Sequence, residues 1–139
     1  MKTKSDNGRQ KKVRRIYYAH AMCTYGTSTE KAERRRIRSS FPKYKIIDPG
    51  EYKGNIEKQI KGMQYCFELI DNCDQLVFSR LLKEITAGVG LEIKYALSKN
   101  IQVYELVGKR VKTIKKPMRH LSRLESIRLF RVWRRMNGS

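Results

Sequence analysis

Short apolar runs alternate with longer segments of helical periodicity along most of this chain, and that alternation restricts the fold more than any other feature. The runs typical of strands are VRRIYYA at 13–19, YKIIDP at 44–49, DQLVFSR at 74–80 and IQVYELV at 101–107. The segments between them predict helices over 30–41, 55–73 and 89–99. Strands joined by helices of this length form right-handed βαβ units. The sequence therefore predicts an α/β fold with a mainly parallel sheet flanked by helices.

Polar residues mark where two of these helices begin. Ser28 or Thr29 can cap the helix over 30–41, and Asn55 is a candidate cap for the helix over 55–73. The second helix carries apolar side chains at helical spacing, and these are Ile56, Ile60, Met63, Cys66 or Phe67, and Ile70. The spacing predicts one amphipathic helix.

Positive charge is concentrated at the two ends of the chain. The formal net charge is +19, yet residues 16–108 are nearly balanced, with 14 basic and 11 acidic side chains. We predict a domain over 16–108 between a disordered basic tail at 1–15 and a basic strand and helix extension at 109–139. Because basic tails attract phosphate-rich surfaces, binding of nucleic acid through these ends is one functional interpretation.

The last part of the chain, after Pro117, predicts a basic C-terminal helix. Its apolar residues share about a third of the circumference at helical spacing, and they are Leu121, Leu129, Val132, Trp133 and Met136. Such a face docks on the domain, on a second subunit or on an anionic partner. We favour docking on the domain.

Other functional classes find less support. No apolar run approaches the roughly 20 residues that span a bilayer, so we expect a cytoplasmic protein. The three cysteines show no metal-ligand spacing, and we expect no disulfide, metal or cofactor. Cys66 and Cys73 are predicted to be buried thiols.

The segment TAGVG at 86–90 suggests a binding site, because it precedes a predicted helix at the carboxyl end of a parallel sheet. Gly88 and Gly90 would expose backbone N–H groups to an anion, and Thr86 would offer a hydroxyl. Glu92 would lie in the first helical turn, where the positive end of the helix dipole would keep its pKa low. An ionised carboxylate there suits attack on the anomeric carbon of a sugar.

Three motifs resemble the nucleoside 2-deoxyribosyltransferase family, including its branch of 2'-deoxynucleoside 5'-phosphate N-hydrolases. They are IYYAHAM at 16–22, CDQLVF at 73–78 and GVGLEIKYALSKNIQVYEL at 88–106. The resemblance implies a flavodoxin-like or Rossmann-like fold, a homo-oligomer, and a glutamate that displaces the base from a deoxyribosyl group. It matches Glu92 to that nucleophile and Tyr17 to the residue that orients it.

Further positions bear on the substrate and on catalysis. Thr86 matches the hydroxyl residue of the phosphate-preferring hydrolases, and the resemblance places His20 where the sugar or phosphate is contacted. Thr24 can also hold a phosphate through its hydroxyl. Cys66 replaces an aspartate that is common in active members, and Lys94 replaces a small residue.

Three functional hypotheses follow. The first is an N-glycosidase or deoxyribosyltransferase acting on a deoxynucleoside or its 5'-monophosphate. The second is a nucleotide-binding or sensing module that retains the pocket without the chemistry, which Cys66 and Lys94 favour. The third is a nucleic-acid-binding protein that acts through its basic ends.

Overall fold

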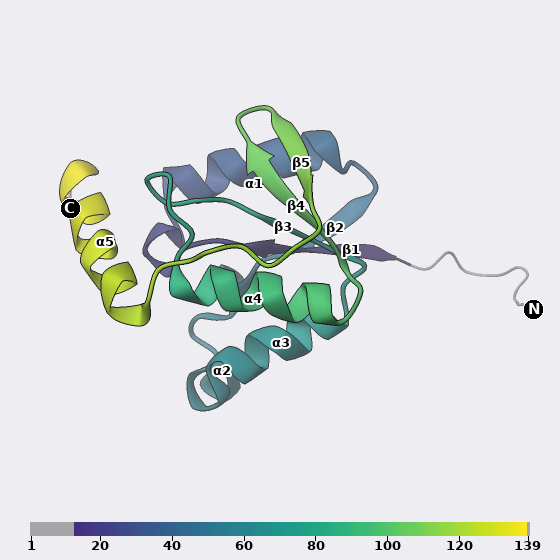
Figure 1. Ribbon diagram of the computed structural model, residues 1–139, viewed down its shortest axis with the longest axis horizontal. Coiled ribbons are helices and arrows are strands. Elements are labelled where there is room, and N and C mark those ends of the chain that lie inside the picture. Colours follow the sequence, from purple (N-terminus) through teal and green to yellow (C-terminus); the bar gives the residue numbers. More distant parts are fainter. Residues whose placement is uncertain (1–12, 139) are drawn as a thin grey trace, which may run out of the picture.

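The computed structural model describes residues 13–138, which form a five-stranded sheet in the order β2-β1-β3-β4-β5 (Figure 1). The strands are β1 (Arg14–Ala19), β2 (Tyr44–Ile47), β3 (Gln75–Phe78), β4 (Gln102–Val107) and β5 (Arg110–Ile114). The first four pair in parallel, and β5 is antiparallel to β4 across a turn at Gly108. This order is that of flavodoxin-like folds, so the predicted α/β fold is confirmed.

Helices cover both faces of the sheet (Figure 1). They are α1 (Ser28–Ser40), α2 (Ile56–Lys61), α3 (Met63–Asp71), α4 (Ala87–Ser98) and α5 (Arg123–Met136), with short 3₁₀ helices η1 (Met22–Thr24) and η2 (Pro49–Tyr52). One face packs against α1, and the opposite face packs against α3 and α4. Successive residues of β1 alternate between the two cores: Ile16 and Tyr18 lie on the α1 side, and Tyr17 lies on the α3 and α4 side.

The helix predicted over 55–73 is two helices, which is a correction. Asn55 caps α2 by accepting a hydrogen bond from the backbone of Lys58, as predicted. Gly62 then adopts a φ of 59°, a left-handed conformation that ends the right-handed helix before α3 begins. The chain therefore turns, and Ile60 of α2 is 79% exposed although its spacing predicted a buried face. Similarly, Thr27 caps α1 in place of the expected Ser28 or Thr29.

The C-terminal helix α5 docks on the domain, as favoured from the sequence. Ser122 and Glu125 form a reciprocal capping box at its start. Trp133 is buried in a small cluster with Ala21, Cys23 and Leu81, which lie at and beyond the carboxyl ends of β1 and β3. The buried face of α5 comprises Ser126, Leu129, Phe130 and Trp133. Val132 and Met136, which were predicted on that face, are exposed. The reason is that the domain contacts only part of the apolar face of α5.

Arg14 and Arg15, which were assigned to the basic tail at 1–15, belong to β1. The remainder of that tail, residues 1–12, lies outside the described residues. Among the residues described, no helix is long and apolar enough to cross a membrane.

Candidate functional site

A cavity of about 590 Å³ opens at the carboxyl end of β1, between α2, α3, the start of α4 and the start of α5. Its volume lies in the range of small-molecule sites. The residues that line it are His20, Met22, Tyr25, Lys53, Lys58, Gln59, Gly62, Met63, Cys66, Thr86, Ala87, Gly88, Val89, Glu92, Arg123, Ser126, Ile127 and Phe130. The lining is mostly apolar and contains a single carboxylate, that of Glu92. Three cations, Lys53, Lys58 and Arg123, also line this cavity.

The carboxylate of Glu92 forms a buried pair with Tyr17. The Tyr17 hydroxyl, from β1, donates a short hydrogen bond to Glu92 Oε2, from α4. Burial and the neighbouring carboxylate raise the pKa of Tyr17 well above its usual value, so its hydroxyl remains a donor at neutral pH. The structure thus brings together the two residues that the sequence resemblance matched to catalysis.

The electrostatics of Glu92 differ from the sequence expectation in two respects. Because α4 begins at Ala87, Glu92 is the sixth residue of the helix and lies beyond its first turn. The residue is 5% exposed, and burial raises its pKa to about 7, although the hydrogen bond from Tyr17 and the charge of His20 oppose the shift. The predicted low pKa is therefore corrected: desolvation outweighs the helix dipole, which acts mainly within the first turn.

The predicted glycine loop is the first turn of α4, which is a second correction. Gly88 lines the cavity, but Gly90 does not. The N–H of Gly90 donates to the carbonyl of Thr86 at 2.9 Å, so it is not exposed for a ligand. A Cβ on Gly90 would lie only 2.2 Å from Cγ of His120, and the absence of a side chain therefore admits the C-terminal segment.

Thr86 is the N-cap residue of α4, but its side chain makes no capping hydrogen bond. The residue is 4% exposed, lines the cavity, and its hydroxyl has no hydrogen-bond partner among residues 13–138. The N–H of Ala87 instead donates to Ser126 Oγ of α5 at 2.9 Å. Ser126, 39 residues beyond Ala87, thus binds the first N–H of α4 in place of Thr86. The hydroxyl of Thr86 therefore remains available to a ligand.

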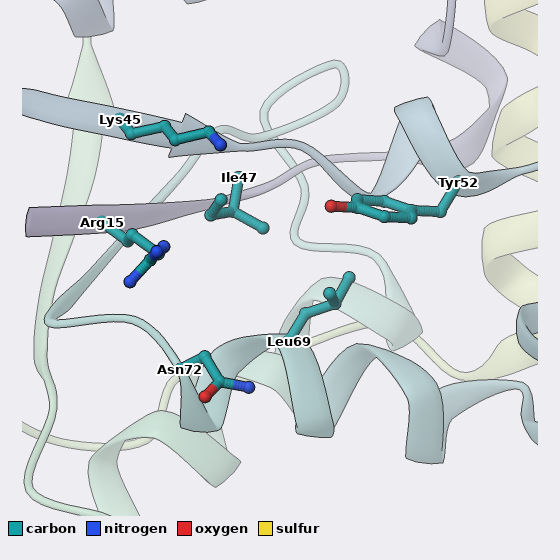
Figure 2. A pocket seen from close by; sticks show the side chains of 6 residues that line it. All are labelled: Arg15, Lys45, Ile47, Tyr52, Leu69 and Asn72. Carbon is teal, nitrogen blue, oxygen red and sulfur yellow. The ribbon is translucent and has the colours of Figure 1, made fainter. Parts of the chain in front are cut away.

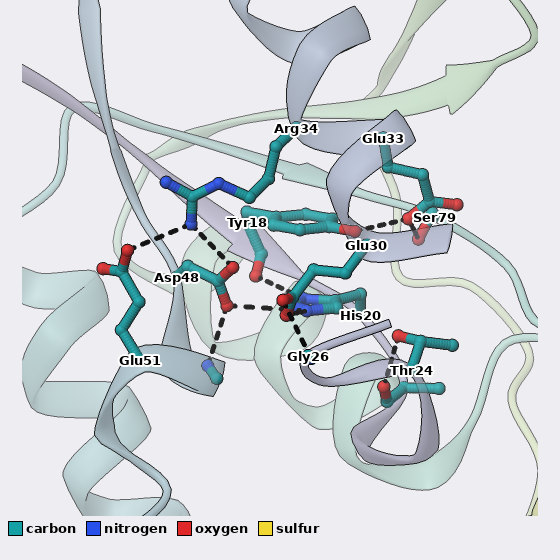
Figure 3. Close-up of polar contacts among 12 residues, drawn as sticks. Tyr18, His20, Thr24, Gly26, Glu30, Glu33, Arg34, Asp48, Glu51 and Ser79 are labelled. Atoms are coloured by element: carbon teal, nitrogen blue, oxygen red, sulfur yellow. Dashed lines mark hydrogen bonds and ion pairs between the residues drawn. The ribbon is translucent and has the colours of Figure 1, made fainter. Parts of the chain in front are cut away.

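His20 lines the cavity but is also part of a buried polar network (Figure 3). Its Nδ1 lies 3.0 Å from the carbonyl oxygen of Tyr18, and its Nε2 lies 2.7 Å from Glu30 Oε2. The imidazole stacks on the Tyr18 ring, with the two centroids 3.6 Å apart. Both ring nitrogens of His20 are therefore engaged by protein groups.

The network beside His20 includes two carboxylates. The ligand atoms of His20, Glu30 and Asp48 lie within 4.8 Å of one another and could hold a metal ion. However, Asp48 already accepts hydrogen bonds from the N–H of Gly50 at 2.7 Å and from Arg34 at 2.8 Å. Because Arg34 supplies a balancing cation, we assign Asp48 a structural role and propose no metal site.

Thr24 does not reach the cavity. Its hydroxyl donates to the carbonyl of Ala21 at 2.8 Å, and Thr24, the last residue of η1, is buried. This arrangement differs from the predicted phosphate contact, because the hydroxyl is used to close the local turn.

Cys66 lies on α3 and lines the cavity close to Glu92. Burial, with the nearby Glu92 carboxylate, raises the pKa of this thiol to about 11, so the side chain is neutral. Cys66 and Cys73 are both buried and unpaired, as predicted. Glu92 is therefore the only acid in the cavity lining within the described part of the chain.

A second cavity, of about 300 Å³, lies between β1, β2 and α3 (Figure 2). It is lined by Arg15, Lys45, Ile47, Tyr52, Leu69 and Asn72. These residues include no acid or thiol, so the cavity offers neither a nucleophile nor a general base of the kind expected for sugar chemistry. The cavity around Glu92 is the better candidate site.

Several lining residues were missed from the sequence, above all Arg123, Ser126, Ile127 and Phe130 of α5. The helical periodicity of the C-terminal segment predicted a helix, but it did not say which surface the helix would meet. Lys53 and Lys58 were missed for a similar reason, because isolated lysines resemble ordinary solvent-exposed residues.

Comparison of the chain with models of protein families, with curated proteins and with solved structures found no match. The likeness to deoxyribosyltransferases therefore stays a prediction from the sequence motifs.

Proposed function

We propose that the protein is an N-glycosidase or deoxyribosyltransferase acting on a deoxynucleoside or its 5'-monophosphate, with Glu92 as the nucleophile. The observation that carries this proposal is the Tyr17–Glu92 pair, which combines a buried carboxylate, an orienting hydroxyl and a cavity of nucleotide size. A carboxylate whose only role was structural would not need an adjoining cavity. The apolar lining would accommodate the base, and the three cations would attract a phosphate.

The reaction has two steps in this proposal. The ionised carboxylate of Glu92 attacks C1' of the sugar, forming a C–O bond while the glycosidic C–N bond breaks. The electron pair of the broken bond goes to the base, which takes up a proton from solvent water and leaves. Water, for hydrolysis, or a second base, for transfer, then attacks C1'; the bond between C1' and the Glu92 oxygen breaks, its electron pair restores the carboxylate, and the attacking group gives up a proton to solvent.

The hydrogen bond from Tyr17 and the burial of Glu92 shift the pKa of the Glu92 carboxyl in opposite directions. The hydrogen bond from Tyr17 favours the ionised carboxylate and holds it in one orientation, whereas burial raises its pKa to about 7. A substantial fraction is ionised at neutral pH, and a weakly solvated carboxylate is a better nucleophile than one surrounded by water.

The decisive experiment is base release from a panel of deoxynucleosides and their 5'-monophosphates by wild type and Glu92→Gln. The amide keeps the shape of the carboxylate but is a poor nucleophile, so we expect a loss of about 10⁴-fold or more. Asp74→Asn, remote from the cavity, serves as a control for general effects of the same chemical change. Equal rates for wild type and Glu92→Gln would remove Glu92 from the mechanism.

A nucleotide-binding module without turnover is the second candidate, and Cys66 favours it. The cavity offers no second acid among the described residues to protonate the leaving base, since the Cys66 thiol stays neutral with a pKa of about 11. Nucleotide binding without release of any base from the panel would favour this candidate over the enzyme.

Nucleic-acid binding is the third candidate, and the charge of α5 favours it. Five exposed arginines lie within about 140° of the helix circumference, and they are Arg123, Arg128, Arg131, Arg134 and Arg135. Binding of DNA or RNA that weakens steeply with salt would support this function, because each neutralised phosphate releases counterions.

A further inference from the structure

We propose that the C-terminal helix α5 contributes the phosphate-binding side chain of this site, and that this side chain is Arg123. The inference rests on the proposed function, because it identifies the ligand as a 5'-phosphorylated nucleoside. It assigns to α5 a direct role in binding, beyond its packing against the domain.

The first turn of α5 is held directly on the start of α4. Ser126 Oγ accepts a hydrogen bond from the N–H of Ala87 at 2.9 Å, and the N–H of Leu121 donates to the carbonyl of Ile85 at 2.8 Å. His120 is seated against Gly90, where any side chain would clash. Three contacts from one short segment thus fix α5 relative to the cavity.

The start of α4 retains backbone N–H groups that have no partner among residues 13–138 and that belong to residues lining the cavity. The first three N–H groups of a helix have no partner within it, and here they belong to Ala87, Gly88 and Val89. Ser126 engages only the first, and both Gly88 and Val89 line the cavity. Beside them lies the Thr86 hydroxyl, which is buried, lines the cavity and lacks a partner among residues 13–138. Two amides and a hydroxyl form a cradle suited to an anion.

Of the three cations that line the cavity, Arg123 is the closest in sequence to Ser126, whose hydroxyl binds the first N–H of α4. It precedes Ser126 by three residues, so the two side chains lie on the same side of α5. Arg123 lines the cavity and forms no ion pair within residues 13–138. By contrast, the charge of Lys58 acts on Glu92 and Cys66, nearer the expected position of the sugar.

The stability of α5 does not explain an arginine at this position. Arg123 is the first residue of the helix, where the dipole is positive and a cation is unfavourable. Glu125 in the same turn already supplies the favourable negative charge and completes the capping box. A phosphate between Arg123 and the start of α4 would relieve this repulsion and would gain charge-assisted hydrogen bonds.

The test measures the affinity of the full chain for the four common deoxynucleoside 5'-monophosphates and their nucleosides by calorimetry. Wild type should bind at least one nucleotide more tightly than its nucleoside. Arg123→Ala should weaken that nucleotide by about 10-fold to 100-fold, the loss expected for one hydrogen bond to a charged group. Nucleoside affinity should change less than threefold.

Arg128→Ala is the matched control, because Arg128 is exposed on the same helix but points about 200° away from Ser126. It should leave both affinities unchanged. Thr86→Val provides an independent variant, which keeps the side-chain volume, removes the hydroxyl and should also weaken the nucleotide selectively. Arg123→Lys should recover part of the loss, since the charge is kept without the bidentate geometry.

The outcomes separate this inference from the proposed reaction. Equal nucleotide affinities for Arg123→Ala and Arg128→Ala would overturn the inference, even if bases are released from nucleosides through Glu92. If Arg123→Ala selectively weakens nucleotide binding and the wild type releases no base, the phosphate site would be supported and the proposed glycosidase activity would be rejected. Equal affinity of wild type for nucleotides and nucleosides would overturn the phosphate site outright.

Discussion

Tyr17 and Tyr18 are neighbours on β1, and each donates a hydrogen bond to a buried glutamate on opposite faces of the sheet. Tyr17 binds Glu92 of α4, whereas Tyr18 binds Glu33 of α1 at 2.5 Å. The first pair faces a cavity of about 590 Å³. The second is closed by Ser79, whose hydroxyl donates to Glu33 at 2.7 Å (Figure 3).

A buried tyrosine–glutamate pair is therefore not by itself a functional site. Both pairs satisfy their polar groups, and both tyrosines have a pKa raised by burial and by the adjoining carboxylate. Only the pair with Glu92 adjoins a space for a ligand. We therefore expect changes at the Tyr17 pair to alter chemistry and changes at the Tyr18 pair to alter stability alone.

The largest predicted effect on stability concerns its dependence on pH. Because the pKa of Glu92 is raised from 4.5 to about 7, the folded state holds its proton where the unfolded state has released it. The contribution of Glu92 to stability is thus fully present below about pH 4.5 and is lost as the pH rises through 7. Glu92→Gln removes this loss, so at pH 8 it should be more stable than wild type by up to about 3 kcal/mol.

Urea unfolding at pH 5 and pH 8 measures this effect. The two proteins should differ far less at pH 5, because wild-type Glu92 is then largely protonated. Glu84→Gln, the same substitution at an exposed position, should change the free energy of unfolding by less than about 0.5 kcal/mol. No difference between wild type and Glu92→Gln at either pH would contradict a raised pKa.

Replacing each tyrosine by phenylalanine compares the two pairs directly. Tyr17→Phe removes the donor that orients Glu92 and should lower base release by about 10-fold to 100-fold, equivalent to about 1.5 to 3 kcal/mol. Tyr18→Phe keeps the ring that stacks on His20 and should leave the rate unchanged while lowering stability. Initial rates of base release and thermal melting temperatures of both variants would distinguish an effect on chemistry from an effect on stability. A larger rate loss in Tyr18→Phe would reverse our assignment of the two faces.

The smallest effect concerns Ser79. Ser79→Ala removes one hydrogen bond to Glu33, which still accepts the one from Tyr18, so stability should fall by only about 1 kcal/mol. Base release should not change. An altered rate of base release would mean that the Tyr18–Glu33 pair influences the cavity around Glu92.

Part of the candidate site could be predicted from the sequence because it depends on local pattern. The period-two alternation of β1 placed Tyr17 and Tyr18 on opposite faces, and the helix after TAGVG brought Glu92 to the carboxyl end of the sheet. The electrostatics were not predictable in this way. The pKa of Glu92 depends on how fully α3, β1 and α4 exclude water around it, and burial enters only with tertiary packing.

Local sequence is enough to predict the alternation of strands and helices, the cap at Asn55 and the amphipathic character of the C-terminal helix, because each depends on neighbours within a few residues. The position of α5 on the domain, and its contribution to the cavity lining, depend on tertiary packing. The hydrogen bond from Ala87 to Ser126 and the seating of His120 on Gly90 join segments 30 to 39 residues apart. No local pattern encodes such contacts, because they depend on the complementarity of two surfaces that exist only after the chain has folded.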